Sequence, residues 1–109
     1  MKWTIDDLPG SQRARQFEGA DRGAGVSFYV THYQPGEGPG LHRHPYEETF
    51  INLEGSATFE VDGRRIEVAA GEVVVAPAGA AHAFKNSGDG VLRQVNIHPV
   101  ERMEQEDLE

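Results

Sequence analysis

The chain contains no cysteine, which excludes both disulfide bonds and thiolate ligands for a metal. Basic side chains are scarce: ten Lys and Arg stand against eighteen Asp and Glu, for a formal net charge of -8. Nucleic-acid binding depends on basic patches, so this charge argues against it. No apolar run approaches the roughly 18 residues of a membrane-spanning helix, and residues 1–10 lack a signal-peptide pattern. We therefore expect a soluble, cytoplasmic protein with no nucleic-acid or membrane partner.

Glycine and proline, by contrast, are abundant, with 13 and 6 of the 109 residues. Both favour tight turns, and turn-rich stretches separate short apolar or alternating segments. These segments lie at 25–34, 47–55, 56–71, 72–79, 81–86 and 91–98. Within the third, the step Asp62-Gly63 is a strong hairpin signal. Short strands at this spacing are typical of an all-β sandwich or barrel, and the chain length suits a single domain.

Two segments flank the predicted strands. Residues 1–10 form an N-terminal arm, in which Trp3 and Ile5 are apolar anchors that either cross to a second copy of the chain or pack on their own barrel. Residues 99–109 form an acidic tail, and the spacing of its acidic and apolar residues predicts a short surface helix.

The alternation of side chains also predicts which face of the first strand is buried. Every second side chain of a strand points to the same face. We expect the apolar face of segment 25–34 to line the barrel interior, together with three phenylalanines from later strands. These interior positions are Val26, Phe28, Val30, His32, Phe50, Phe59 and Phe84.

The heptapeptide HRHPYEE at residues 42–48 gathers side chains that bind metals. His42 and His44 are two residues apart, so on an extended segment both point to one face, and Glu48 is in phase with them. His82 opens a later strand, directly after the turn-rich stretch PAGAA. Three imidazoles and one carboxylate suit a divalent transition metal such as Zn, Fe, Mn, Ni, Co or Cu. A solvated turn is the alternative, since polar residues are common in loops.

Two motifs around these residues resemble the cupin family. The first family motif is Gly, five residues, His-x-His, three or four residues, Glu, six residues, Gly. Residues 36–55 fill it with Gly36, His42, His44, Glu48 and Gly55. The second is Gly, five residues, Pro-x-Gly, two residues, His, three residues, Asn. Residues 71–86 fill it with Gly71, Pro77, Gly79, His82 and Asn86.

The resemblance implies a cupin-type double-stranded β-helix, a jelly-roll barrel, over residues 1–109, and a homodimer. It further implies that one divalent metal per chain is held by His42, His44, Glu48 and His82. The six-residue gap to Gly55 favours Glu48 over its neighbour Glu47 as the carboxylate ligand. Glu47 is then a solvated carboxylate or a partner for Arg43.

The family does not fix one reaction, because cupins include dioxygenases, isomerases, decarboxylases, epimerases and non-enzymatic ligand binders. Our leading hypothesis is a metal-dependent dioxygenase or related oxidoreductase that acts on a small organic substrate, with the metal as Lewis acid and Glu48 as general base. The alternatives are a non-catalytic module that binds a sugar or another small ligand, and a cupin isomerase or decarboxylase.

The sequence also offers candidates for the substrate pocket. They are Tyr46, Phe50, Asn52, Phe84, Arg93, Gln94 and His98, and a structural role on a strand is the alternative for each. His32 and His98 have no partner at metal-ligand spacing. An arginine facing the cavity would favour a carboxylate or phosphate substrate, whereas an aromatic lining would favour a phenolic one.

Overall fold

The computed structural model describes all residues from Met1 to Glu109, and nearly all of its regular structure is β. One antiparallel sheet has the order β1 (Ala14–Phe17), β2 (Ser27–Tyr33), β9 (Leu92–His98), β4 (Glu48–Glu54), β7 (Val73–Ala76). The other has the order β10 (Glu106–Asp107), β3 (His42–Arg43), β8 (His82–Asn86), β5 (Ala57–Val61), β6 (Arg64–Val68). We call them the first and the second sheet. The helices are two 3₁₀ turns, η1 (Ile5–Asp7) and η2 (Gly19–Asp21).

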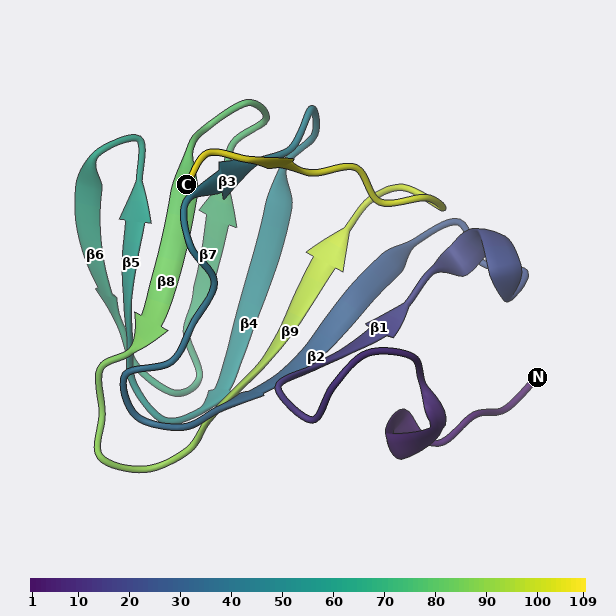
Figure 1. Ribbon diagram of the computed structural model, residues 1–109, viewed down its shortest axis with the longest axis horizontal. Helices are drawn as coiled ribbons and strands as arrows, with labels where there is room; N and C mark the ends of the chain where they lie inside the picture. The colour runs from purple at the N-terminus through teal and green to yellow at the C-terminus, as the bar shows by residue number, and fades with distance from the viewer.

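The two sheets face each other and enclose the core (Figure 1). From β2 onward the chain crosses repeatedly between them, because β2, β4, β7 and β9 belong to the first sheet and β3, β5, β6 and β8 to the second. This is the jelly-roll arrangement, so the predicted all-β fold is confirmed. None of the helical turns has the length and apolarity that crossing a membrane requires.

Three phenylalanines form the apolar centre of the core. Phe50 of the first sheet packs edge-on against Phe59 and Phe84 of the second, with ring centroids 4.9 and 5.6 Å away. Phe59 and Phe84 stack on each other at 4.9 Å. All three side chains are buried, and each burial stabilises the fold by about 1.5–3 kcal/mol. The prediction that they line the interior is confirmed.

The predicted orientation of the first strand is wrong. Ser27 and Thr31 of β2 are buried, whereas Phe28 lies on the outer face, where its ring stacks on Phe17 at 4.6 Å. Val26 lies before the strand and is 46% exposed, and His32 is exposed.

Strand pairing explains the reversal. In the ladder between β2 and β9, Thr31 lies opposite Gln94 and Tyr29 lies opposite Asn96. Gln94 and Asn96 face the interior, so this part of the interior is polar, and the more polar face of β2 completes it. The apolar side chains of β2 therefore cover the outside of the sheet, under the N-terminal arm, where Trp3 contacts Phe17.

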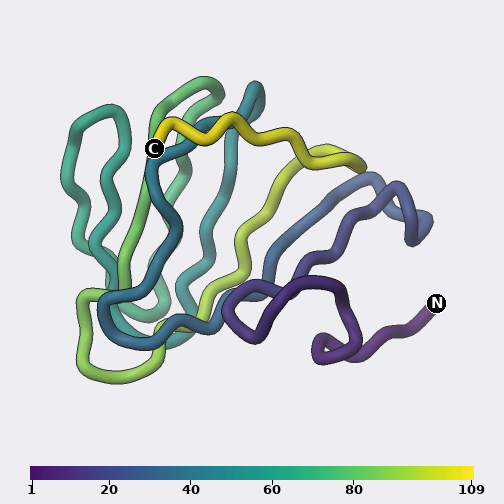
Figure 2. The backbone as a smooth tube through the Cα atoms, in the orientation of Figure 1, coloured from purple at the N-terminus to yellow at the C-terminus, as the bar shows by residue number.

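The predicted C-terminal helix is wrong as well. After β9 the chain crosses to the edge of the second sheet and ends beside β3 (Figure 2). There Glu106 and Asp107 form β10, and the Leu108 N–H donates to the Leu41 carbonyl at 2.9 Å. The open edge of β3 offers backbone partners to the tail, whereas a helix of so few residues is only marginally stable.

Two glycines of the sequence motifs provide a test of the fold. Gly55 and Gly71 both have a positive φ, at 83° and 86°. A Cβ at Gly55 would also lie 2.3 Å from the Val91 carbonyl oxygen, while at Gly71 it would meet open space. We expect Gly71→Ala to lower the free energy of unfolding by about 1 kcal/mol and Gly55→Ala by about 3 kcal/mol. Denaturation in urea measures both, and equal losses would contradict the packing described.

Candidate metal centre

Four side chains converge at one end of the barrel. His42 and His82 are cross-strand partners in β3 and β8, and their rings lie 4.3 Å apart. His44 follows β3 directly, and its carbonyl accepts the Gly79 N–H at 2.8 Å, which ties the first motif to the second. Glu48 is the first residue of β4 and reaches the same point from the opposite sheet.

The donor atoms of this group are close and buried. One ligand atom from each of His42, His44, Glu48 and His82 lies within 4.8 Å of all the others. Glu48 Oε1 is 2.9 Å from His44 Nε2 and 3.1 Å from His82 Nε2. Because metal–ligand bonds are about 2 Å long, one ion bridges donor atoms about 4 Å apart. Glu47, in contrast, is exposed, and Arg43 pairs with Glu106 at 3.0 Å and not with Glu47.

Backbone carbonyls fix the orientation of all three imidazoles. Nδ1 of His42 lies 2.7 Å from the Gly40 carbonyl oxygen. Nδ1 of His44 lies 2.6 Å from the Glu104 carbonyl oxygen, and Nδ1 of His82 lies 2.9 Å from that of Ala80. A carbonyl only accepts, so each Nδ1 carries the proton, and Nε2 of the neutral ring is a bare lone pair.

This arrangement fits a cation. With all three rings neutral, three Nε2 lone pairs and the ionised carboxylate are all acceptors around one point; in metal-free protein a proton on Nε2 joins His44 or His82 to Glu48. Hydrogen bonds from metal-binding histidines to backbone carbonyls commonly fix the tautomer in this way. The four residues therefore match a divalent metal in geometry, charge and protonation.

Electrostatics at the centre keep the carboxylate ionised. Burial raises the pKa of Glu48, but its contacts with His44, His82 and His98 lower it more, so the net pKa lies well below the ordinary value. Burial lowers the pKa of His42, which favours the neutral, ligating ring. In His44 burial also lowers the pKa, but the contacts with Glu48 and with the Glu104 carbonyl outweigh it, and the net pKa is raised.

His98 belongs to the centre, although its spacing in the sequence gave no sign of this. It ends β9, its side chain is buried, and its Nε2 lies 3.1 Å from Glu48 Oε2. Its Nδ1 lies 2.7 Å from the Tyr46 hydroxyl, which also accepts the Glu104 N–H at 3.1 Å. Gln94, Asn96 and His98 are alternate residues of β9, so their side chains point to the same inward face. Only the pairing of β9 with β4 places that face beside Glu48.

A cavity of about 200 Å³ adjoins His42 and Glu48. Three of the candidate pocket residues, Phe50, Phe84 and His98, line it together with Tyr29, Tyr33 and Asn96. The other pocket candidates lie elsewhere. Asn52 and Gln94 are buried deeper in the barrel, and the hydroxyl of Tyr46 is hydrogen-bonded to His98.

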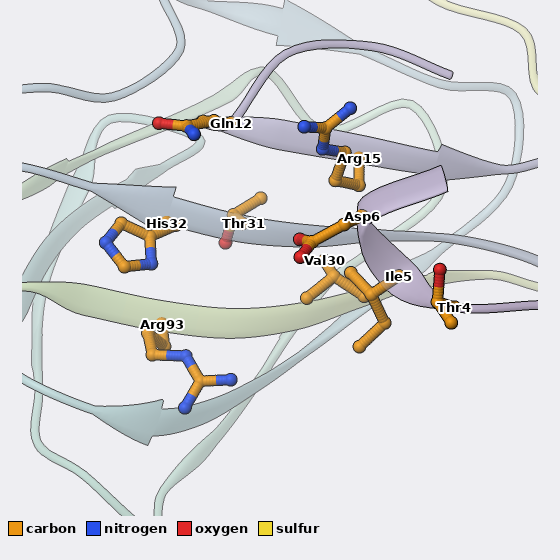
Figure 3. Close-up of a pocket in the computed structure, with 9 residues that line it drawn as sticks. All are labelled: Thr4, Ile5, Asp6, Gln12, Arg15, Val30, Thr31, His32 and Arg93. Carbon is orange, nitrogen blue, oxygen red and sulfur yellow. The ribbon is translucent and has the colours of Figure 1, made fainter. Parts of the chain in front are cut away.

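Arg93, whose direction the sequence left open, does not face the cavity. It lies 3.9 Å from Glu54 on the outer face of the first sheet. There, with His32, it lines a separate pocket of about 480 Å³ beneath the N-terminal arm (Figure 3). Side chains alternate between the two faces along β9, so Arg93 points outward while its neighbour Gln94 and Asn96 point inward.

Metal affinity is expected to fall as the pH falls from 7 to 5. Despite burial, the pKa of His44 is raised above its ordinary value near 6.5, chiefly by its contact with Glu48, so protons bind this ring more readily than an ordinary imidazole. Proton and metal compete for the same nitrogen, so each pH unit below that pKa costs about tenfold in affinity. Calorimetric titration of untagged protein with Zn²⁺ at pH 7.5, 6.5 and 5.5 measures this, with His32→Ala as a control at an exposed imidazole. A pH-independent affinity would contradict the ligand set.

Comparisons with known proteins agree with the fold and the site. Residues 29–98 match the family described as "Cupin domain". The chain is 35% identical over 63 residues to the polyketide synthase CurC of Streptomyces cyaneus, which covers 57% of this chain and 41% of that protein. It is 34% identical over 56 residues to the oxalate-binding protein of Thermotoga maritima, covering 50% of this chain and 46% of that protein. The chain thus spans less than half the length of these curated relatives.

Solved structures resemble it over nearly its whole length. The oxalate decarboxylase of Lactobacillus farciminis in its formate complex has a TM-score of 0.82 at 24% identity, covering 95% of this chain and 34% of that one. A Bacillus subtilis oxalate decarboxylase studied for its Mn(II) centres has a TM-score of 0.84 at 23% identity, covering 95% and 30%. At this identity the likeness shows the fold alone. The family match covers more than half of the chain, and the chain therefore belongs to the cupin family.

Proposed function

We propose that this protein holds one divalent transition metal per chain at His42, His44, Glu48 and His82, and uses it to bind and convert a small organic molecule. The observation that carries this is the all-acceptor centre: three carbonyl-fixed imidazoles turn their Nε2 atoms toward a buried carboxylate. With all three rings neutral, such a centre is electrostatically unfavourable until a cation fills it. A metal bound by four protein groups keeps further positions open for a ligand, as catalytic sites do.

The charge of the cavity favours a ligand with one anionic oxygen. No lysine or arginine lines the cavity, and Arg93 points to the outer face. A divalent metal with one carboxylate carries a single formal positive charge, which one phenolate or enolate oxygen balances. Phe50, Phe84, Tyr29 and Tyr33 give the remaining wall an aromatic character. At about 200 Å³ the cavity is smaller than the 300–1,000 Å³ of drug-sized pockets, so the ligand is small.

We therefore favour a small phenol or an enolised dicarbonyl as substrate and a dioxygenase or related oxidoreductase as the reaction type. The bound metal would supply Lewis acidity that stabilises the substrate anion. Glu48 is ionised and lines the cavity, so it is placed to accept the hydroxyl proton of the substrate. His98, 3.1 Å from Glu48 Oε2, would orient the carboxylate.

Oxalate is the second candidate ligand, with binding or decarboxylation as the function. It is favoured by the oxalate-binding relative and by the oxalate decarboxylases among the solved structures. The absence of a cationic side chain in the cavity speaks against this dianion. An oxygen-uptake and ligand-binding screen of metal-loaded protein over small phenols, 1,3-diketones and oxalate separates the two candidates.

Glu48→Ala tests whether the protein is an enzyme of this kind. Three histidines remain in the variant, so it should keep measurable metal but lose turnover per bound metal by roughly 100-fold or more, as expected for loss of a general base. Glu47→Ala removes the neighbouring exposed carboxylate and should leave both quantities unchanged. Metal analysis and oxygen uptake on the same samples give the turnover per bound metal. Unchanged turnover per metal in Glu48→Ala would contradict the catalytic role.

We also propose a homodimer that pairs through the outer face of the first sheet. Val73 and Val75 of β7 are 59% and 54% exposed there. The apolar surface continues onto β4 and β9, because Val73 and Val75 are in register with Ile51 and Thr49 and, through them, with the half-buried Val95 and Ile97 of β9. Exposed apolar surface of this extent is typical of an interface.

Sedimentation equilibrium is expected to give twice the mass of the chain. Val75→Asp should shift the protein toward monomer, because it places an unpaired charge in the proposed interface. Ile66→Asp, at a partly exposed position of the second sheet, should leave the dimer intact. A monomer mass for the wild type at all concentrations would exclude the dimer.

A further inference from the structure

The barrel interior contains a row of amides below the metal centre. Asn52, Gln94 and Asn96 are 1%, 0% and 4% exposed. Asn52 of β4 and Gln94 of β9 are cross-strand partners, and Asn96 lies two residues along on the same inward face. Three amides in one small core require an explanation, because each must exchange its hydrogen bonds to water for others.

The protein satisfies these amides only in part: Asn52 Nδ2 donates to the Gly55 carbonyl at 2.9 Å. Asn52 Oδ1, Asn96 Oδ1 and both amide atoms of Gln94 are buried without a hydrogen-bond partner in the protein. A buried polar atom left in this state costs about 1–3 kcal/mol. Native proteins keep few such groups and usually have a reason for each.

Asn86, another buried amide, shows how the fold treats an amide with a structural role. Its Nδ2 donates to the carbonyls of Tyr33 at 3.0 Å and Gly90 at 2.7 Å, and its Oδ1 accepts the Gly88 N–H at 3.0 Å. The amide nitrogen of Asn86 thus donates twice and its oxygen accepts once, and the side chain stabilises the turn after β8. The amide of Asn96 has no comparable structural partners.

Asn96 lines the cavity that also contains His42, Glu48 and His98. A molecule held at the metal would therefore share its cavity with this amide. Gln94 and Asn52 do not line the cavity and lie behind Asn96. They can hydrogen-bond to buried water, which commonly serves unsatisfied polar groups of this kind.

We propose that Asn96, supported by Gln94 and Asn52, forms a neutral hydrogen-bonding subsite in the metal cavity. It binds a second, uncharged polar group of the ligand, such as a hydroxyl or an amide, while an anionic oxygen of the same ligand lies on the metal. A second carboxylate is disfavoured, because no lysine or arginine lines the cavity to balance its charge. This inference rests on the proposed function and defines its ligand class more closely.

Matched ligand pairs test the subsite. Kojic acid and allomaltol share one chelating hydroxypyranone and differ in a single hydroxyl, as do pyrogallol and catechol. Calorimetry with anaerobic Zn²⁺-loaded protein should show the hydroxylated member of at least one pair binding roughly three- to tenfold more tightly, the range of one net hydrogen bond. Asn96→Leu should remove that preference and leave zinc content and the affinity of the simpler ligand unchanged.

The outcomes distinguish this inference from the proposed function. If no member of either pair binds, the metal-dependent function itself fails, and the subsite fails with it. If all four bind but neither pair shows a preference that Asn96→Leu removes, the subsite is wrong and the proposed function stands.

Thermal unfolding gives an independent readout. An amide without structural partners is dispensable for stability, so Asn96→Leu should keep the Tm of the wild type within a few degrees or raise it. Asn86→Leu should lower the Tm by roughly 8 °C or more, since it removes three hydrogen bonds. A loss in Asn96→Leu as large as that in Asn86→Leu would show a structural amide and overturn the proposal.

Discussion

The buried, ionised Glu48 carboxylate and the imidazoles around it form the interaction on which the rest of the structure depends. A desolvated anion costs several kcal/mol unless positive charge compensates it. The imidazoles are held with their Nε2 lone pairs inward by carbonyls of three separate loops, at Gly40, Ala80 and Glu104. The turn before β3, the turn before β8 and the C-terminal tail therefore all act on the same centre. The tail in particular is part of the site, because its Glu104 backbone contacts both His44 and Tyr46.

The interior of the barrel is graded along its length. Glu48 contacts His98 at one end, and strand register places Phe50 beside Asn96 in the middle and Asn52 beside Gln94 at the far end. Eleven of the 23 buried residues are polar or charged, so the apolar core of this small chain is limited. Three phenylalanines supply much of the burial that stabilises it. Metal binding, and pairing through the apolar outer face of the first sheet, would add the stability that such an interior lacks.

Much of the site followed from local sequence. The two cupin motifs brought His42, His44, Glu48 and His82 together, whereas two-residue alternation alone accounts only for the shared face of His42 and His44. Contacts that depend on strand pairing were beyond reach. His98 had no ligand-spaced neighbour, and only the ladder between β4 and β9 places it next to Glu48. The prediction for β2 chose the wrong face as buried for a related reason. The barrel interior beside β2 is polar, so the more polar face of this strand is buried and its apolar face lies outside. The tail was assigned a helix because its own pattern does not show that the edge of β3 is free.

The most direct test of the central claim is a crystal structure of the Mn²⁺- or Zn²⁺-loaded protein with anomalous diffraction data. The account predicts one anomalous peak per chain inside the barrel, bound by Nε2 of three histidines and by a Glu48 oxygen at about 2.0–2.3 Å, with at least one further position open to the cavity. It also predicts that the three Nδ1 contacts to backbone carbonyls remain in place. A stoichiometric metal bound elsewhere, or an empty centre in crystals grown with excess metal at pH 7.5, would contradict it.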